Sequence, residues 1–157
     1  MAENKPEKEK IFEVPFHWTA DYLYSYGEIS RFFIEVVNNK KLYGARCTKC
    51  DMVWMPPKGY CSECYEATEW TPLSGKGTVI ACTYCYQAPG AEVPEYLGLP
   101  YVLALIKLDG TDTYFRHGIA TNEPTIGSVK VGSRVKVAFR EERKGTIADF
   151  YFVLDEL

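Results

Sequence analysis

Two pairs of cysteines with the same spacing constrain this chain more than any other feature. Cys47 and Cys50 form one C-x2-C pair, Cys61 and Cys64 form a second, and ten residues separate the pairs. Each pair can place two sulfur atoms on one side of a tight turn, so the four thiols can converge on one tetrahedral metal ion. Four thiolates leave no open position for water or substrate. The spacing therefore predicts a structural zinc site, with iron as the lesser alternative.

A third pair, Cys82 and Cys85, has the same spacing in a different context. It lies within TVIACTYCY, a run of strand-forming residues, and residues three apart in a strand point to opposite faces. These two thiols cannot converge on one metal without a bulge, so we expect two small strand residues. A catalytic role for either would need a nearby base, and the chain contains only two histidines.

Charge and hydropathy narrow the class of protein. The chain has 157 residues, enough for one ordinary domain or two very small ones, and its formal net charge of -3 argues against duplex nucleic acid as a partner. No apolar run approaches the ~20 residues of a membrane helix, and the N-terminus MAENKPEKEK is charged. We therefore expect a cytoplasmic protein. Thiols stay reduced in the cytoplasm, so paired cysteines there are more often metal ligands than disulfides.

The first 41 residues are expected to contain a tail and two helices. Residues 1–10 are rich in Lys and Glu and predict a disordered tail, and residues 11–41 predict an N-terminal helical segment. Thr19 can cap a first short helix that Gly27 ends, with five aromatic residues in or beside it. Those aromatics either pack in the core or dock on another chain, and both interpretations stay open.

The second helix is predicted within residues 27–41. Apolar side chains recur there at the helical spacing i, i+3, i+4, i+7 and i+8, which are Ile29, Phe32, Phe33, Val36 and Val37. Asn38 and Asn39 are expected to end this helix. It leads directly into the cysteine segment, for which we predict a rubredoxin-like zinc ribbon over residues 42–72.

The remaining sequence, residues 73–157, favours short strands separated by Gly, Pro and Asp. Five are expected, over residues 75–87, 100–108, 112–120, 133–140 and 146–154. The fourth alternates between three core-facing apolar residues and three cationic ones, which are Val135, Val137, Phe139 and Arg134, Lys136, Arg140. An Asp-Gly pair predicts a hairpin between the second and third strands. The fold class is thus mainly β with N-terminal helices, and we expect an antiparallel five-stranded sheet curled into an OB-fold barrel.

The order of these motifs resembles a known family. RCTKCDMVWMPPKGYCSEC precedes GKGTVIACTYCYQAPG, GLPYVLALIKLDG and VKVGSRVKVAF. Over about residues 20–154 the chain is similar to the zinc-ribbon plus OB-fold accessory proteins associated with acyl-CoA thiolases, a family long labelled as of unknown function. Where that family often has Gly after each pair of cysteines, this chain has Asp51 and Tyr65. Tyr tolerates a left-handed backbone less well than Asp, so we expect an irregular second knuckle.

The resemblance implies a non-catalytic accessory subunit. Such a subunit docks on a thiolase-fold partner in a hetero-oligomer, stabilises it, and helps to form a channel for CoA or acyl-CoA, with structural zinc as its own cofactor. The residues agree, because acyl transfer needs a nucleophilic Cys beside His bases, and the two histidines lie far apart in the sequence. The alternative is a module that binds single-stranded nucleic acid, although the acidic composition counts against it.

Candidates for the ligand or partner side fall in two regions. The loop between the cysteine pairs, residues 51–60, is expected to be an exposed contact surface, and the barrel is expected to contribute tyrosines and a pair of cationic residues. The candidates are Trp54, Met55, Lys58, Tyr84, Gln87, Tyr101, Arg116 and His117. The long loop over residues 87–100 and the cationic face of the fourth strand are further expected contact surfaces, the latter for a partner or the anionic end of CoA.

Overall fold

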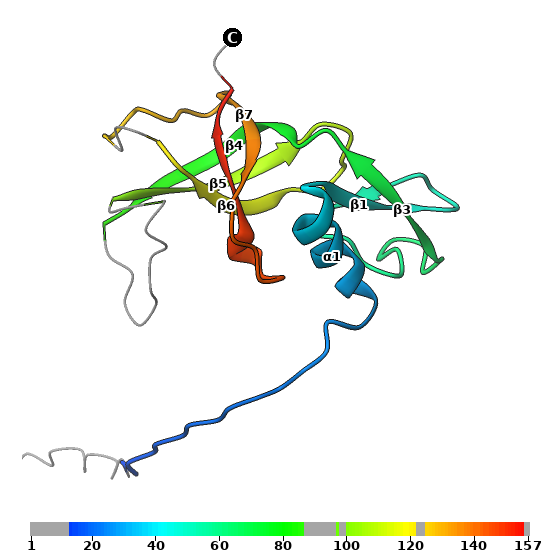
Figure 1. Ribbon diagram of the computed structural model, residues 1–157, viewed down its shortest axis with the longest axis horizontal. Coiled ribbons are helices and arrows are strands. Elements are labelled where there is room, and N and C mark those ends of the chain that lie inside the picture. The colour runs from blue at the N-terminus through cyan, green and yellow to red at the C-terminus, as the bar shows by residue number, and fades with distance from the viewer. Residues whose placement is uncertain (1–12, 87–96, 98–99, 122–124, 156–157) are drawn as a thin grey trace, which may run out of the picture.

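Within the described residues, one α-helix is followed along the chain by a three-stranded sheet and then by a five-stranded barrel (Figure 1). The computed structural model describes residues 13–86, 97, 100–121 and 125–155. The elements are η1 (Gly27–Ile29), α1 (Ser30–Asn39), β1 (Leu42–Cys47), β2 (Val53–Trp54), β3 (Thr68–Leu73), β4 (Lys76–Cys85), β5 (Tyr101–Leu108), β6 (Phe115–Ile119), β7 (Arg134–Phe139), η2 (Ile147–Asp149) and β8 (Phe150–Leu154). The predicted tail (1–10) and most of the predicted contact loop (87–100) lie outside the described residues.

The barrel has the strand order β4-β5-β6-β8-β7 and closes through pairing of β7 with β4. All neighbouring pairs are antiparallel except β6 and β8, which run parallel where Ile119 faces Phe152. This is the OB-type arrangement, so the predicted fold class is confirmed. The prediction of a wholly antiparallel sheet was wrong, because five strands in a closed ring cannot alternate in direction at every pair.

One hydrophobic core joins the barrel to α1. Alternate residues of β5 point inward and are buried, and they pack with Phe150 and Phe152 of β8. The predicted helix is confirmed, and Phe32 and Val36 of its apolar stripe are buried in the same core, with the ring of Phe32 6.0 Å from that of Phe150. The helix ends at Asn39, where Lys40 takes a left-handed conformation with φ 52°.

The segment before α1 is not helical. Residues 13–26 form no helix or strand and run away from the rest of the molecule in Figure 1, so the predicted helix from Thr19 to Gly27 was wrong. The reason is visible in the sequence, because apolar residues occupy every even position, with a period of two instead of 3.6: Val14, Phe16, Trp18, Ala20, Tyr22, Tyr24 and Tyr26. No helix within the described residues is long and apolar enough to span a membrane.

The sheet β2-β1-β3 and its two cysteine turns form a unit that we call the ribbon, residues 42–73. Its central strand β1 pairs with β3 along its whole length, from Leu42 opposite Leu73 to Cys47 opposite Thr68. The loop between β5 and β6 hydrogen-bonds to the outer strand β2. The ribbon is therefore held against both α1 and the barrel.

Candidate metal centre and surrounding surface

The four cysteines of the ribbon come together at its tip. All four Sγ atoms lie within 4.8 Å of one another, with Cys47 and Cys64 at 3.3 Å and Cys50 at 3.7 Å from both Cys61 and Cys64. A tetrahedral ion with Zn–S bonds of about 2.3 Å requires sulfurs about 3.8 Å apart. The arrangement fits a metal ion such as zinc, and it offers four donors with no fifth group among the described residues.

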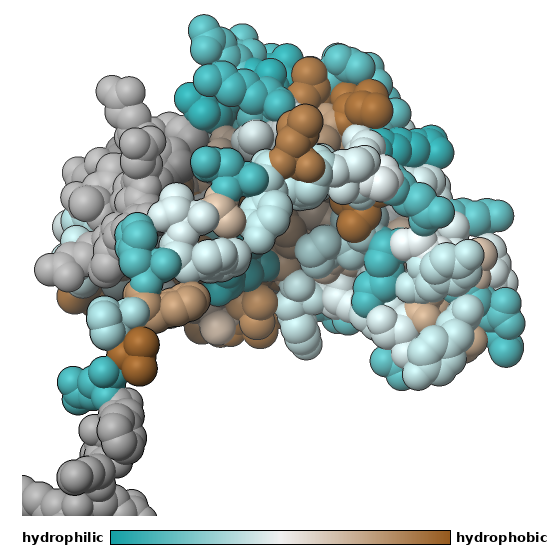
Figure 2. Space-filling view, turned by 90° about the horizontal axis from the view of Figure 1, so that it is seen from below, coloured by the Kyte–Doolittle hydropathy of each residue, from teal (hydrophilic) through white to brown (hydrophobic). Residues whose placement is uncertain are grey.

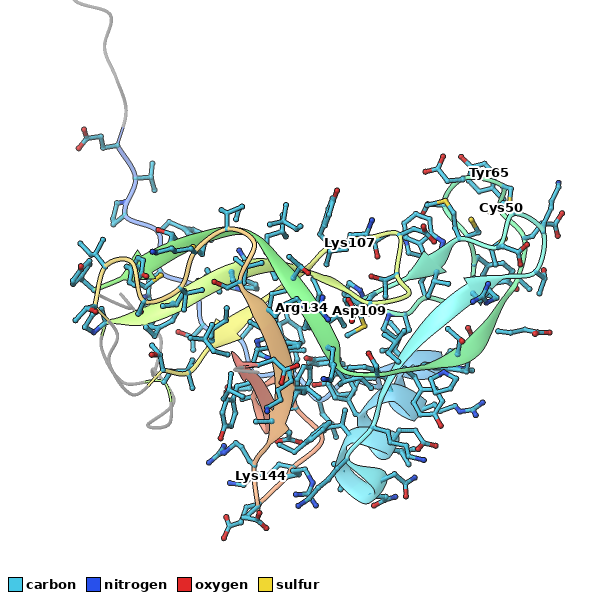
Figure 3. The ribbon with its side chains drawn as sticks, turned by 90° about the horizontal axis from the view of Figure 1, so that it is seen from above. Cys50, Tyr65, Lys107, Asp109, Arg134 and Lys144 are labelled. Carbon is cyan, nitrogen blue, oxygen red and sulfur yellow. The ribbon has the colours of Figure 1, made fainter. Side chains whose placement is uncertain are left out.

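Two matching turns build this centre. The amide of Cys47 donates to the carbonyl of Met52, and the amide of Cys61 donates to that of Glu66, both at 2.9 Å. Asp51 and Tyr65 both have φ 60°. The expectation of an irregular second knuckle was therefore wrong: Tyr65 adopts the same left-handed turn as Asp51, and its exposed ring lies at the ribbon tip, where Figure 3 labels it beside Cys50.

The thiols perturb one another because they are so close. Amide hydrogen bonds, led by that of Cys50, lower the pKa of Cys47. Burial opposes ionisation of Cys61, yet the amides of Cys64 and Glu63 outweigh it and bring the pKa of Cys61 to about 6. The hydrogen bond with Cys47 raises the pKa of Cys64 to about 12. A divalent cation would relieve this conflict by stabilising the ionised form of all four thiols at once.

The loop between the cysteine pairs is more buried than the sequence suggested. Met55 is only 1% exposed and belongs to the hydrophobic core, so its assignment to an exposed contact surface was wrong. Trp54 is half-buried, and its ring lies 3.6 Å from the ammonium of Lys58, which also donates to Ser62. Lys58 is thus held in place by a cation–π contact.

A cleft of about 420 Å³ lies between the start of α1 and the ribbon. Lys58 lines one side, and Arg31 lies on the other, over the ring of Trp70 at 5.4 Å. Glu28 closes the cleft against Gly59, where a Cβ would collide with the carboxylate. No pattern in the sequence marks Arg31 or Trp70, because only the packing of α1 on the ribbon brings them to Lys58.

The candidate tyrosines of the barrel are engaged by their own chain. The hydroxyl of Tyr84 donates to the carbonyl of Val129 at 3.1 Å and accepts from the amides of Gly127 and Val129 at 2.8 and 3.0 Å. Burial opposes ionisation of Tyr84, but these bonds together with Ser128 lower its pKa. The hydrogen bond with Cys85 raises the pKa of Tyr101. Tyr84 therefore anchors the segment before β7, and Gln87 lies outside the described residues.

His117 and Arg116 face different surroundings. The imidazole of His117 packs edge-on against Phe115, Phe150 and Phe152, and its buried Nε2 has no hydrogen-bond partner among the described residues. Burial lowers the pKa of His117 to about 4, so the ring is neutral at pH 7. His117 is thus half-buried against the core, whereas Arg116 is exposed, and the assignment of both to the ligand side stays a prediction.

The cationic face of β7 is largely neutralised. Arg134 forms a two-pronged ion pair with Asp109, with Nη1 and Oδ1 2.9 Å apart, and Figure 3 shows the two side by side. Lys136 lies 3.1 Å from Asp155, which also pairs with Lys76. Both cations of β7, Arg134 and Lys136, are thus compensated locally, which weakens this face as a binding surface for phosphates or nucleic acid.

Cys82 and Cys85 do not join the metal centre. The thiol of Cys82 reaches the carbonyl of Val129 at 3.6 Å and packs against the barrel core. Cys85, three residues along β4, hydrogen-bonds with Tyr101 instead. Within the described residues, the only cluster suited to a metal ion is the one in the ribbon, as the strand periodicity predicted.

Comparison with known proteins finds one matching family model and two similar solved structures. Residues 70–140 match the family model described as ChsH2, C-terminal OB-fold domain. No curated protein matches the chain. A solved structure titled "Ltp2-ChsH2(DUF35) aldolase" is similar with a TM-score of 0.60 and 18% identity, covering 83% of this chain and 96% of that one. A DUF35 protein of unknown function from Sulfolobus solfataricus has a TM-score of 0.59 and 21% identity, covering 82% and 87%.

The matched region and the fold agree with each other. The family model begins within β3 and ends just after β7, so it covers four of the five barrel strands. Both structures span almost the same share of this chain and therefore include more than the barrel. Residues 70–140 thus match the model of the ChsH2 C-terminal OB-fold domain, and the predicted resemblance of the chain to the DUF35 family is confirmed.

Proposed function

We propose that this chain is a non-catalytic accessory subunit of a thiolase-like acyl-CoA enzyme complex. In this role Cys47, Cys50, Cys61 and Cys64 hold a structural zinc ion, and the ribbon and barrel stabilise a thiolase-fold partner and help to form its CoA or acyl-CoA channel. The observation that carries the proposal is the match of residues 70–140 to the ChsH2 OB-fold domain. The similar structure is titled as an aldolase that combines ChsH2 with a second named protein, Ltp2.

The chemistry of the described residues supports a non-catalytic role. A thiolase-type reaction needs a reactive thiolate with a histidine base in reach. His117 packs against phenylalanine rings, and His17 lies on the exposed N-terminal segment, where its Nε2 is 3.2 Å from the hydroxyl of Thr19. Neither histidine contacts a cysteine among the described hydrogen bonds.

The cleft beside the ribbon is the surface that we assign to the anionic end of CoA. Arg31 and Lys58 are both held over tryptophan rings and present two positive charges at one concave site. Phosphate groups suit such a pair of cations. Nucleic-acid binding is the less favoured alternative, because Arg134 and Lys136 on the barrel are already paired with carboxylates.

Purification of the affinity-tagged chain from its native source tests the proposal. We expect a thiolase-fold subunit to co-purify in a fixed stoichiometric ratio, and the isolated partner to lose activity and thermal stability that the added chain restores. Purified chain that turns over an acyl-CoA on its own would contradict the non-catalytic role. Salt-dependent binding of single-stranded oligonucleotides without any effect on such a partner would favour the alternative.

A further inference from the structure

Residues 13–26, which we call the arm, form a largely exposed apolar segment. Its even-numbered residues are all apolar or aromatic, and Phe16 and Trp18 are 87% and 68% exposed. No backbone-to-backbone hydrogen bond between described residues involves residues 13–25. The face seen in Figure 2 carries brown, apolar side chains on the arm beside the grey N-terminal residues. An exposed apolar row with the period of a strand indicates a surface for interaction.

A groove of about 470 Å³ along α1 is lined by apolar side chains that suit the apolar residues of the arm. Phe33, Ile34 and Val37 contribute apolar side chains, and Ile34 is exposed. Tyr26, the last aromatic residue of the arm, lies at the groove with its ring 4.4 Å from that of Phe33, and Tyr24 packs on Tyr26 at 5.5 Å. The groove therefore already accepts aromatic side chains from the base of the arm.

The arm and the groove also carry charges of opposite sign. The arm contains Glu13 and Asp21 and no Lys or Arg, whereas Arg143 and Lys144 line the opposite side of the groove. The Arg143 guanidinium donates to backbone carbonyls, including that of Val37 at 3.0 Å. No carboxylate among the described residues pairs with either cation. An acidic apolar strand is therefore a suitable occupant.

The direction and length of the arm favour the groove of another molecule. The arm leaves the groove at Tyr26 and runs away from the body, so its own Phe16 and Trp18 would reach the groove only after the chain reversed near Gly27 (Figure 1). A ten-residue helix such as α1 is about 15 Å long, which matches about five residues of an extended strand. Residues 16–20 of a second copy fit this length without any reversal.

We propose that two copies of this chain exchange arms, each placing Phe16 and Trp18 in the groove beside α1 of the other and Asp21 near Lys144. Phe16 and Trp18 of the two arms together bury on the order of 800 Å² of aromatic side chain. This area is about what one partner contributes to a protein–protein interface of standard size. The symmetric exchange closes on itself as a dimer and leaves no further arm unpaired. The proposal does not depend on a thiolase-like partner.

Light scattering coupled to size-exclusion chromatography of the full-length chain, over a series of concentrations, tests the exchange. We expect a dimer that dissociates on dilution, and Trp18→Ser or Ile34→Glu should raise its dissociation constant at least about tenfold. Leu23→Ser is the control, because Leu23 is a fully exposed apolar residue of the arm at an odd position, and it should leave the dimer unchanged. A monomer at every concentration, or a dimer insensitive to Trp18→Ser, would overturn the proposal.

Swapping the charges of Asp21 and Lys144 between two variants distinguishes exchange between two copies from an arm that folds back on its own groove. Asp21→Lys and Lys144→Glu should each weaken the dimer, because each homodimer then brings like charges together. Mixing the two variants restores both opposite-charge contacts between copies, so a heterodimer should form with nearly the original affinity. Variants that remain monomeric on mixing would contradict exchange between copies.

Discussion

The backbone amide of Val53 donates to the carboxylate of Asp112 at 2.8 Å, and the amide of Asp112 donates to the carbonyl of Val53 at 2.9 Å. Val53 lies on β2, the outer strand of the ribbon, and Asp112 lies in the loop between β5 and β6 of the barrel. This reciprocal pair covers a strand edge that would otherwise be open. It also fixes the metal-binding tip of the ribbon relative to the barrel.

Thr113→Val should loosen this connection and destabilise the chain by about 1–3 kcal/mol. The Thr113 hydroxyl accepts from the amide of Met55 at 2.7 Å and donates to its carbonyl at 2.8 Å, so an isosteric valine leaves two backbone groups of a buried residue unpaired. Urea unfolding measures the change. Thr83→Val, at an exposed position of β4, is the control and should stay within about 0.5 kcal/mol. Equal losses in both variants would contradict a specific role for Thr113.

Lys58→Ala should weaken binding of CoA by the assembled complex about tenfold, because one of the two cations of the cleft is lost. The measurement is the KM or dissociation constant for CoA in the purified complex. Lys49→Ala is the control, since Lys49 also lies on the ribbon but pairs with Glu66 outside the cleft. An equal effect of both substitutions would indicate a general charge effect and would remove the cleft from the proposed CoA surface.

Features encoded by short-range spacing could be predicted from the sequence. Cys47 and Cys61 converge because each belongs to a C-x2-C turn that needs only a few residues. The barrel strands could be predicted from alternating apolar residues and from turn residues such as Gly110, whose φ is 83°. The turn before β8 also had a signal that was not used: Thr146 and Asp149 form a capping box.

Features that depend on packing between distant segments could not be predicted. Met55 lies in a loop sequence rich in Pro and Gly, which suggests exposure, but β2 carries it into the core beside the barrel. His117 stands beside an exposed arginine, yet the return of β8 encloses it with Phe150 and Phe152. The helix predicted in the arm was wrong for another reason. Thr19 and Gly27 are residues that commonly begin and end helices, but the apolar residues between them recur at every second position, as in a strand.

Cys47→Ser should release the metal and unfold the ribbon, because the alcohol replaces one of four thiolate ligands at the centre. Metal analysis of the purified protein measures zinc content, and circular dichroism with limited proteolysis measures ribbon structure. Cys82→Ser is the matched control: Cys82 lies in the barrel and contacts only Val129 among the described hydrogen bonds, so zinc content should stay unchanged. Equal loss of zinc in the two variants would contradict the assigned ligands.

His117→Phe should make folding less sensitive to acid. The pKa of His117 is about 4 in the folded chain and near its ordinary 6.5 when unfolded, so the unfolded state binds the extra proton below pH 6.5. This group's contribution to stability is complete above pH 6.5 and is lost as the pH falls toward 4, by about 2 kcal/mol between pH 7 and pH 5. Urea unfolding at the two pH values should show that His117→Phe lacks this loss, while His17→Gln, which changes the other histidine on the exposed arm, retains it. A wild-type chain and a His117→Phe variant with the same pH dependence would show that the imidazole is open to protons in the folded state.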